Sequence, residues 1–253
     1  IENIYNGGGV GIADFNNDGL QDIYFTGNTV SNKLYLNKGN FQFEDITDAA
    51  GVNGEGKWCR GVGIVDINND GLPDMHISAT ILSNAQKRQD ILYINKGVNS
   101  NGVPTFTNMA KEYGLNDTAH STMAAFFDYD NDGDLDMYLL INEVKKDEFP
   151  NKFRPVFKNS ENPNTDKLYR NDWNDSLKHP VFTDVSKQAG ITIEGYGHGV
   201  TICDLNKDGW KDVYATNDFM PENLLYINNK NGTFSNKEQE YFKHTSSNSM
   251  GQD

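Results

Sequence analysis

Acidic side chains recur at a fixed spacing in four short segments of the chain. Each segment has the pattern D-x-[DN]-x-D-G-x-x-D and begins at Asp14, Asp66, Asp128 or Asp204. Carboxylates crowded into a short loop repel one another or take up protons unless a cation lies between them. Ca²⁺ binds six to eight oxygen atoms at about 2.3–2.6 Å, and alternate side chains of such a loop, with one backbone carbonyl, can supply them. The sequence therefore predicts a calcium site in each segment.

The predicted ligands occupy positions 1, 3, 5, 7 and 9 of each loop, with position 7 contributing its carbonyl. They are Asp14, Asn16, Asp18, Leu20 and Asp22; Asp66, Asn68, Asp70, Leu72 and Asp74; Asp128, Asp130, Asp132, Asp134 and Asp136; and Asp204, Asn206, Asp208, Trp210 and Asp212. The loops contain no Cys or His, which disfavours Zn²⁺. We therefore expect about four Ca²⁺ ions as the cofactors.

An EF-hand is the main alternative for such a loop, because it begins with the same D-x-[DN]-x-[DN]-G pattern. An EF-hand requires a bidentate Glu at position 12, where these loops have Phe25, Ile77, Leu139 and Ala215. A solvated Asp-Gly turn is the simpler alternative for a single copy, but four copies in register disfavour it. We expect each loop to join two strands of a β-hairpin.

The loops lie within a longer repeat of short apolar segments. Small and apolar residues precede each loop, an apolar segment follows it, and a third segment, Leu-Tyr-x-Asn, lies at 34–37, 92–95, 168–171 and 225–228. A fourth segment begins with Phe. Four short strands per repeat, with apolar faces that neighbouring repeats must cover, are typical of a β-propeller blade. The predicted fold is all-β, with about four blades of a larger ring.

The expected blades have approximate boundaries along the chain. They are about 5–52, 53–115, 116–192 and 193–243, with the start of a fifth repeat at 244–253. An insertion at 142–165 separates the second and third segments of the third repeat, and we expect either a partner-binding loop or a mobile one. The chain begins Ile1-Glu2-Asn3, so we expect it to be part of a longer or processed protein.

The combined pattern resembles the FG-GAP/VCBS repeat family of calcium-binding β-propellers, which includes the repeats of integrin α-chains. The segment Asn-Asp-Phe-Met-Pro-Glu-Asn-Leu-Leu-Tyr at 217–226 resembles the ASPIC/UnbV-associated group of bacterial surface and secreted proteins. The resemblance covers nearly the whole chain. It implies a seven-bladed ring, Ca²⁺ between the first and second strands of a blade, and a role in adhesion, ligand binding or complex assembly. The fourth repeat's degenerate tail, the insertion and the lack of a ring-closing strand depart from the family pattern.

The charge of the chain limits its partners. The 22 Lys and Arg residues against 36 Asp and Glu residues give a net charge of −14. Nucleic acid needs an electropositive face, so a nucleic-acid partner is disfavoured. No apolar run approaches the roughly 18 residues that span a membrane. We expect a protein or glycan partner at the cell surface, with assembly into a larger envelope complex as a further possibility.

A ligand site is expected at the end of the blades opposite the Asp loops, where the first strand of each blade begins. The candidate residues there are Trp58, Arg60, His120, Tyr196 and His198. Aromatic, Arg and His side chains around a channel mouth suit a sugar or a peptide. The alternative is ordinary packing between blades with solvated polar ends.

Two functional hypotheses follow. The first is a non-catalytic, calcium-stabilised extracellular or cell-surface module, and the resemblance points to a bacterial outer-membrane surface. The second is a polysaccharide lyase or hydrolase on a calcium-binding propeller, which needs acid–base groups that are not committed to a metal. Only His120, Tyr196 and His198 remain for that purpose, without a visible nucleophile, so we assign no catalytic residue and prefer the first hypothesis.

Overall fold

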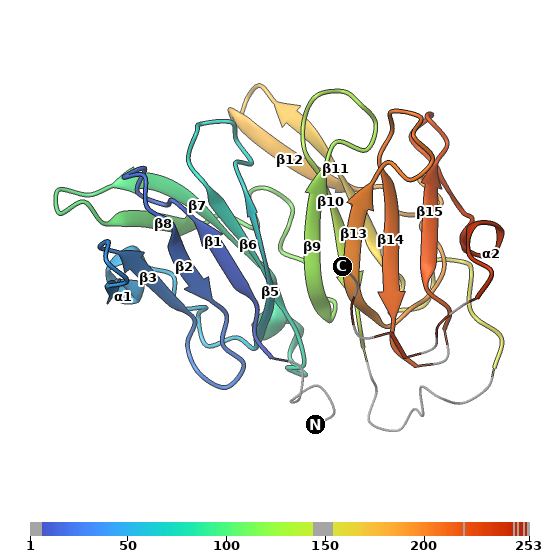
Figure 1. The fold of residues 1–253 in the computed structure, drawn as a ribbon, viewed down its shortest axis with the longest axis horizontal. Coiled ribbons are helices and arrows are strands. Elements are labelled where there is room, and N and C mark those ends of the chain that lie inside the picture. Colours follow the sequence, from blue (N-terminus) through green and yellow to red (C-terminus); the bar gives the residue numbers. More distant parts are fainter. Residues whose placement is uncertain are drawn as a thin grey trace. The chain divides into compact units, whose positions relative to one another are not determined.

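A computed structural model describes residues 7–143, 154–219, 221–244, 246, 248–249 and 251. The chain divides into two compact units. Unit 1 comprises 1–121 and 173–181, and unit 2 comprises 122–172 and 182–253. Sixteen strands form four antiparallel sheets in the described residues (Figure 1).

Each sheet consists of four strands that are consecutive in the sequence and adjacent in space. The first sheet contains β1 (Val10–Ala13), β2 (Asp22–Phe25), β3 (Lys33–Asn37) and β4 (Phe43–Asp45), and the second contains β5 (Cys59–Val65), β6 (Asp74–Ala79), β7 (Ile91–Val98) and β8 (Pro104–Asn108). The third contains β9 (Ser121–Phe127), β10 (Asp136–Ile141), β11 (Lys167–Asn174) and β12 (His179–Asp184), and the fourth contains β13 (Gly197–Cys203), β14 (Asp212–Asn217), β15 (Leu224–Asn228) and β16 (Phe234–Asn236). This up-and-down order is that of a propeller blade.

The sheets of unit 1 pack face to face around one apolar core. Tyr24 and Leu34 of the first sheet and Met75 and Ile77 of the second are fully buried in it. The short helix α1 (Thr47–Ala50) lies beside β3 and β8, and Gly51 ends it with φ +77°, a left-handed conformation that glycine adopts without strain. A 3₁₀ helix, η2 (Ala85–Arg88), lies between β6 and β7.

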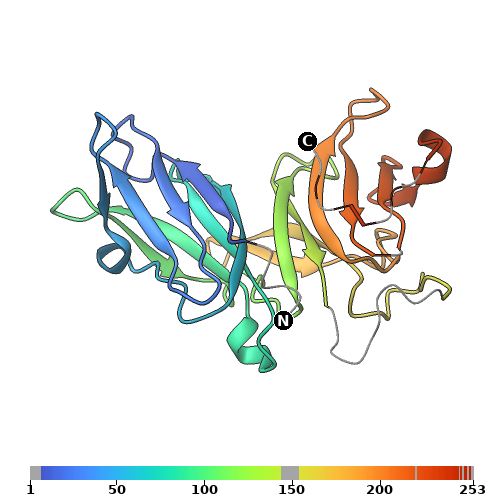
Figure 2. The same cartoon turned by 60° about the horizontal axis from the view of Figure 1, so that its bottom comes forward.

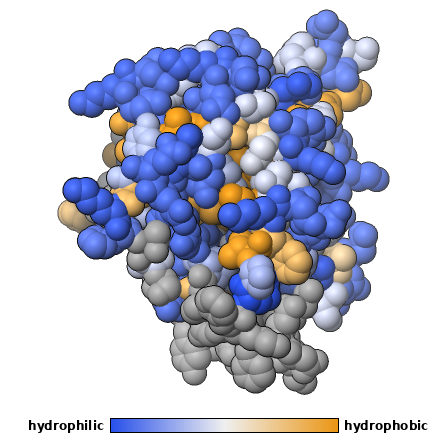
Figure 3. All heavy atoms as spheres, turned by 90° about the vertical axis from the view of Figure 1, so that its right-hand side faces the viewer, coloured by the Kyte–Doolittle hydropathy of each residue, from blue (hydrophilic) through white to orange (hydrophobic). Residues whose placement is uncertain are grey.

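Unit 2 repeats the same packing with its own residues. Tyr138 and Leu168 of the third sheet are buried together with Val213 and Tyr226 of the fourth. β10 contacts β13, and the two strands lie side by side in Figures 1 and 2. The helix α2 (Glu238–Tyr241) follows β16 and contacts β15. The side of the molecule that carries α2 is mostly hydrophilic, with a smaller group of apolar residues between the polar ones (Figure 3).

The predicted all-β fold of four-stranded blades is confirmed. The seven-bladed ring stays a prediction, and the expected fifth repeat at 244–253 lies partly outside the described residues. None of the helices in the described part of the chain has the length and apolar character that a membrane crossing requires.

A buried polar residue stands immediately before the third strand of every blade. Asn32, Asp90, Asp166 and Asn223 are each at most 3% exposed. Each accepts a backbone N–H from the end of the second strand or just beyond it, at N···O distances of 2.7–2.9 Å. These side chains therefore hold the turn between the second and third strands. We call this position the latch.

The latch of the third blade is a carboxyl group where the first and fourth blades have an amide. Asp166 accepts the Tyr138 hydroxyl at 2.9 Å, whereas Asn32 donates its amide to the Tyr24 hydroxyl at 2.7 Å. Burial raises the pKa of Asp166 to about 7. Because the folded pKa lies above the ordinary value of 3.8, the carboxyl group lowers the stability of unit 2 as the pH rises from about 4 to about 7.

We expect Asp166→Asn to stabilise the protein at pH 8 by on the order of 2–4 kcal/mol and to have little effect near pH 4. Asn32→Asp should do the reverse, destabilising at pH 8 because it places a carboxylate where an amide is buried. Urea unfolding of both variants and the wild type at pH 4, 6 and 8 measures this. A difference between Asp166→Asn and wild type that does not change with pH would contradict it.

Candidate metal centre

Every Asp loop joins the first and second strands of its blade. The four loops occupy 14–21, 66–73, 128–135 and 204–211. The residue at position 4 and the Gly at position 6 both have positive φ, about 56–60° and 83–99°. An added Cβ at Gly19, Gly71, Gly133 or Gly209 would meet nothing within 4 Å, so the backbone conformation and not the space favours glycine there. The strands on either side distinguish these loops from EF-hands.

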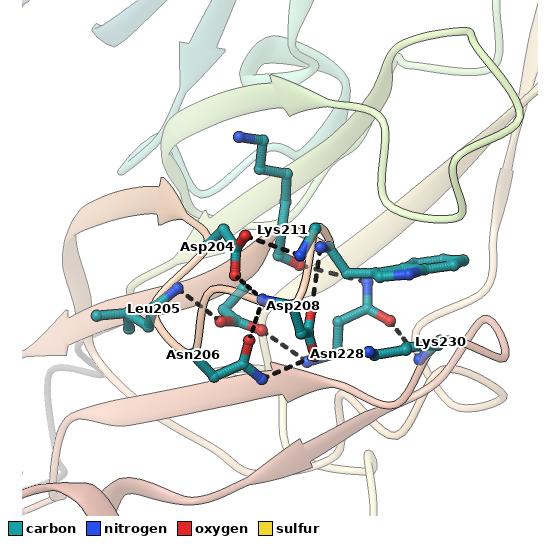
Figure 4. A network of polar contacts seen from close by, with 10 residues as sticks. Asp204, Leu205, Asn206, Asp208, Lys211, Asn228 and Lys230 are labelled. Carbon is teal, nitrogen blue, oxygen red and sulfur yellow. Dashed lines mark hydrogen bonds and ion pairs between the residues drawn. The ribbon is translucent and has the colours of Figure 1, made fainter.

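The polar side chains of each loop bind its own backbone, as Figure 4 shows for the fourth loop. Asp204 accepts the N–H groups of Asp208 and Gly209, both at 2.9 Å. The Asn206 amide donates to Asp208 Oδ2 at 2.9 Å, and Lys230 Nζ lies 3.3 Å from the same oxygen. The position-1 Asp makes the same two contacts in the other three loops. These hydrogen bonds fix the shape of the loop and hold its carboxylates close together.

The position-9 Asp has a role that the sequence did not reveal. Asp22, Asp74, Asp136 and Asp212 are fully buried. One oxygen of each accepts the N–H of loop position 2, at 2.9–3.1 Å. The other accepts the N–H of the Asn that ends Leu-Tyr-x-Asn, at 2.7–2.9 Å. This Asp thus ties the loop to the third strand.

The third loop has the donor set that fits a hard cation best. Carboxylate oxygens of Asp128, Asp130 and Asp136 all lie within 4.8 Å of one another. Position 3 is a carboxylate here, whereas the other three loops have Asn. Oδ1 of Asp130 and Oδ1 of Asp134 are buried without a hydrogen-bond partner among the described residues. Buried acceptor oxygens without donors, beside converging carboxylates, are what a calcium ion would satisfy.

The electrostatics of the third loop agree with this fit. Burial, with repulsion from neighbouring carboxylates, raises the pKa of Asp130 and raises that of Asp134 to about 6. Burial raises the pKa of Asp136 to about 8 and that of Asp74 to about 7, although two backbone N–H groups oppose this in each case. The protein alone therefore does not compensate these charges fully, and a divalent cation would.

The Asn of Leu-Tyr-x-Asn links neighbouring blades within each unit. Asn95 donates its side-chain amide to the Phe15 carbonyl at 2.9 Å, and Asn228 donates to the Tyr129 carbonyl at 2.7 Å. Both acceptors are position 2 of the preceding blade's Asp loop. The third strand of one blade thus holds the loop of the blade before it.

We expect Asn228→Ala to destabilise the protein by about 1–3 kcal/mol, because it leaves the buried Tyr129 carbonyl without this donor. Asn37→Ala is the matched control, since Asn37 donates its amide only within its own blade, to the exposed Gln21 carbonyl. The free energy of unfolding in urea with saturating Ca²⁺ is the measurement. Equal losses of unfolding free energy in the two variants would show that the contact between blades does not contribute to stability.

Comparison with known proteins identifies the repeat. Residues 14–77, which hold the first two Asp loops, match the model of the FG-GAP-like repeat. This part of the chain is an FG-GAP repeat. The ASPIC/UnbV association that we expected receives no support from this match, which names the FG-GAP-like repeat alone.

Two curated relatives match nearly the whole chain at low identity. Cartilage acidic protein 1 of Xenopus tropicalis is 24% identical over 237 residues, which are 92% of this chain and 32% of the relative. The mouse protein of the same name is 23% identical over 231 residues, 91% of this chain and 32% of the relative. The chain with its FG-GAP repeat thus spans about a third of these relatives. Both are animal proteins, so they do not support the bacterial outer-membrane surface.

A solved structure also matches. It is the structure of an Agrocybe aegerita lectin that specifically recognises non-reducing terminal N-acetylglucosamine. The match covers 89% of this chain and 64% of that one, at 17% identity and a TM-score of 0.34.

The candidate ligand residues of unit 1 lie at the start of β5 and just before β9. Arg60 is 7% exposed, and its Nη1 is buried without a hydrogen-bond partner among the described residues. Burial lowers the pKa of Arg60 to about 10. Trp58 Nε1 also lacks a partner there, and His120 Nδ1 accepts the Ile81 N–H at 3.1 Å. Arg60 is thus buried, whereas Trp58 and His120 are half-buried.

In unit 2, Tyr196 is 2% exposed, and its ring meets Phe219 edge to face at 5.2 Å. His198 Nε2 lies 3.2 Å from the Asn142 amide and 3.7 Å from Asp218. The placement of all five candidates around one channel mouth stays a prediction.

The insertion at 142–165 joins β10 and β11, and its residues 144–153 lie outside the described residues. Its described part is fixed by one buried carboxylate. Arg154 makes a bidentate ion pair with Glu194, which is 1% exposed, and the Phe157 N–H donates to the same carboxylate at 2.8 Å. The Arg154 guanidinium also lies over the Phe157 ring, 4.8 Å from its centroid. This end of the insertion is therefore an anchored loop.

Proposed function

We propose that this chain is a non-catalytic, calcium-stabilised extracellular module that binds protein or glycan partners. The observation that carries the proposal is the third Asp loop, where three carboxylates converge and two buried oxygens lack donors. The same loop geometry recurs in all four blades, which suits four ions. Four divalent ions would together offset more than half of the net charge of −14. The FG-GAP match and the relatives named cartilage acidic protein 1 support a non-enzymatic module outside the cell.

Asp128, Asp130, Asp132 and Asp136 would hold the ion of the third loop. A bound calcium ion would supply charge compensation and cross-linking of the hairpin, and no chemical step. The first, second and fourth loops would bind more weakly, because each has an Asn amide at position 3 in place of a carboxylate.

Isothermal titration of chelator-treated protein with CaCl₂ tests the proposal, with MgCl₂ as the control for simple screening. About four Ca²⁺ ions should bind, the tightest of them lost in Asp130→Ala. Mg²⁺ should bind more weakly, because it demands a smaller octahedral site. Absence of calcium binding would overturn the proposal.

The polysaccharide-active alternative finds no support in the residues left for it. The candidate acid–base groups are packed against the protein, with Tyr196 buried and His120 bound to the backbone of Ile81. Incubation with a polysaccharide panel should release no new reducing or unsaturated ends. If the wild type releases such ends and His120→Ala or His198→Ala abolishes the release, the enzyme hypothesis would be favoured.

A further inference from the structure

A cleft of about 680 Å³ lies in unit 2, beside the third Asp loop. It is lined by residues of the third and fourth blades, among them Asp130, Arg170, Gln188, Trp210, Lys230 and Thr233. Its size falls within the range of small-ligand sites, about 300–1,000 Å³. The lining combines an aromatic surface with two cationic side chains and several neutral polar groups.

The residue types at this cleft are not those that the blade fold needs. Arg170 occupies the x position of Leu-Tyr-x-Asn, where the other repeats have the buried aliphatic residues Leu36, Ile94 and Ile227. Trp210 occupies loop position 7, where the first two repeats have Leu. Aliphatic residues therefore satisfy the packing at the x position, and loop position 7 does not require an aromatic residue. The charge of Arg170 partly serves to offset Asp130, but this does not account for Trp210.

The cationic groups are held in place and partly open to solvent. Two nitrogens of Arg170 donate to the two oxygens of Asp172, each at 3.0 Å, and its side chain is 42% exposed. Lys230 is 48% exposed beside Asp208. An arginine fixed in this way loses little freedom when it binds a further acceptor.

The charge of the cleft depends on the third and fourth loops. An ion in the third loop would compensate Asp130 and Asp132, and one in the fourth loop would compensate Asp208, the carboxylate beside Lys230. Asp172 holds two nitrogens of Arg170, and the remaining N–H groups of the guanidinium can meet a ligand. An anionic ligand is then favoured. The half-buried indole of Trp210 offers a flat apolar surface for a ring, and the exposed side-chain amide of Gln188 offers hydrogen bonds for hydroxyl groups.

We propose that this cleft binds a saccharide that carries a carboxylate, with the sugar ring against Trp210 and the carboxylate at Arg170. The inference rests on the proposed function for the calcium ion that sets the charge of the cleft. It adds the position of the site and the chemical class of the ligand.

The test is isothermal titration of the intact chain in excess Ca²⁺ with trigalacturonate, which carries the ring and the charge together. The fully methyl-esterified trisaccharide keeps the rings and removes the charge, and a short poly-Glu peptide keeps the charge without the rings. Trigalacturonate should bind at least about tenfold more tightly than either. Trp210→Leu and Arg170→Leu should each weaken it about tenfold or more, as expected for loss of a stacking surface or a charge-assisted hydrogen bond.

Both variants use a residue that the chain itself has at the corresponding position of its first repeat, so we expect them to fold. Trp173→Leu is the control, because Trp173 is 55% exposed and does not line the cleft. No binding of trigalacturonate, equal binding of the peptide, or binding unchanged in both cleft variants would each overturn the inference. If Ca²⁺ still raises the melting temperature of the same samples, the protein binds calcium as proposed, and only the saccharide site is rejected.

Discussion

Removal of divalent cations with excess chelator is expected to lower the melting midpoint of the protein by at least about 10 °C. Each ion that binds only the folded loop adds about 2.7 kcal/mol when free Ca²⁺ is 100 times its dissociation constant. For a chain of this size, 1 kcal/mol changes the midpoint by about 2–4 °C. Two occupied sites are therefore enough for the expected change, and four would exceed it.

The reason lies in how the loops are built into the cores. The position-9 Asp is fully buried and hydrogen-bonded to the third strand, so repulsion within a loop acts directly on the blade. Without an ion, the buried carboxyl groups must lose their charge or the loop must open.

The measurement is a thermal scan by circular dichroism with chelator, with chelator followed by excess CaCl₂, and with NaCl at matched ionic strength. Ca²⁺ should restore the midpoint, whereas NaCl should not, because salt screens exposed charges but not buried ones. An unchanged midpoint in chelator would reject a structural metal.

The sequence predicted the features that are local and repeated. The Asp loops, the hairpins around them and the four strands per blade depend on patterns such as Gly at position 6 and Leu-Tyr-x-Asn, each visible within a few residues. Because each pattern occurs four times at corresponding positions, the prediction drawn from it was firmer than one drawn from a single copy. The FG-GAP match at 14–77 agrees with the family that these patterns indicated.

The latch could have been found in the same way, because every repeat reads [DN]-x-Leu-Tyr-x-Asn. Its role depends on burial, since the same Asn or Asp in solvent would be an ordinary turn residue. The links between blades, such as Asn228 to Tyr129, join residues 99 positions apart. No local pattern shows such a contact.

The cleft was missed for a different reason. From the sequence, Trp210 was expected to contribute only its backbone carbonyl and Arg170 had no predicted role, and only the structure places their side chains on one surface beside the third loop. The sequence directed attention to the opposite ends of the strands, where Tyr196 and Arg60 prove to be buried.

The last prediction separates the two roles that the loop carboxylates combine. Asp136→Ala should destabilise the protein by about 2–6 kcal/mol in chelator as well as in Ca²⁺, because it leaves the buried N–H groups of Tyr129 and Asn171 without acceptors. Asp132→Ala should cost less than about 1 kcal/mol in chelator, since Asp132 is exposed and the Asp134 N–H that it accepts, at 3.2 Å, lies in the same exposed loop. In Ca²⁺ it should cost more, because the ion of the third loop is lost.

Asp136→Asn refines the comparison, because an amide keeps one acceptor oxygen and places an N–H donor opposite the other backbone N–H. Its cost in chelator should therefore lie between those of Asp132→Ala and Asp136→Ala. Urea unfolding of the three variants, with and without Ca²⁺, gives six free energies. Equal costs for Asp132→Ala and Asp136→Ala in chelator would mean that position 9 acts only through the metal. The expected inequality would mean that the loop is first a hydrogen-bonded junction between the first and third strands, and a calcium site built on that junction.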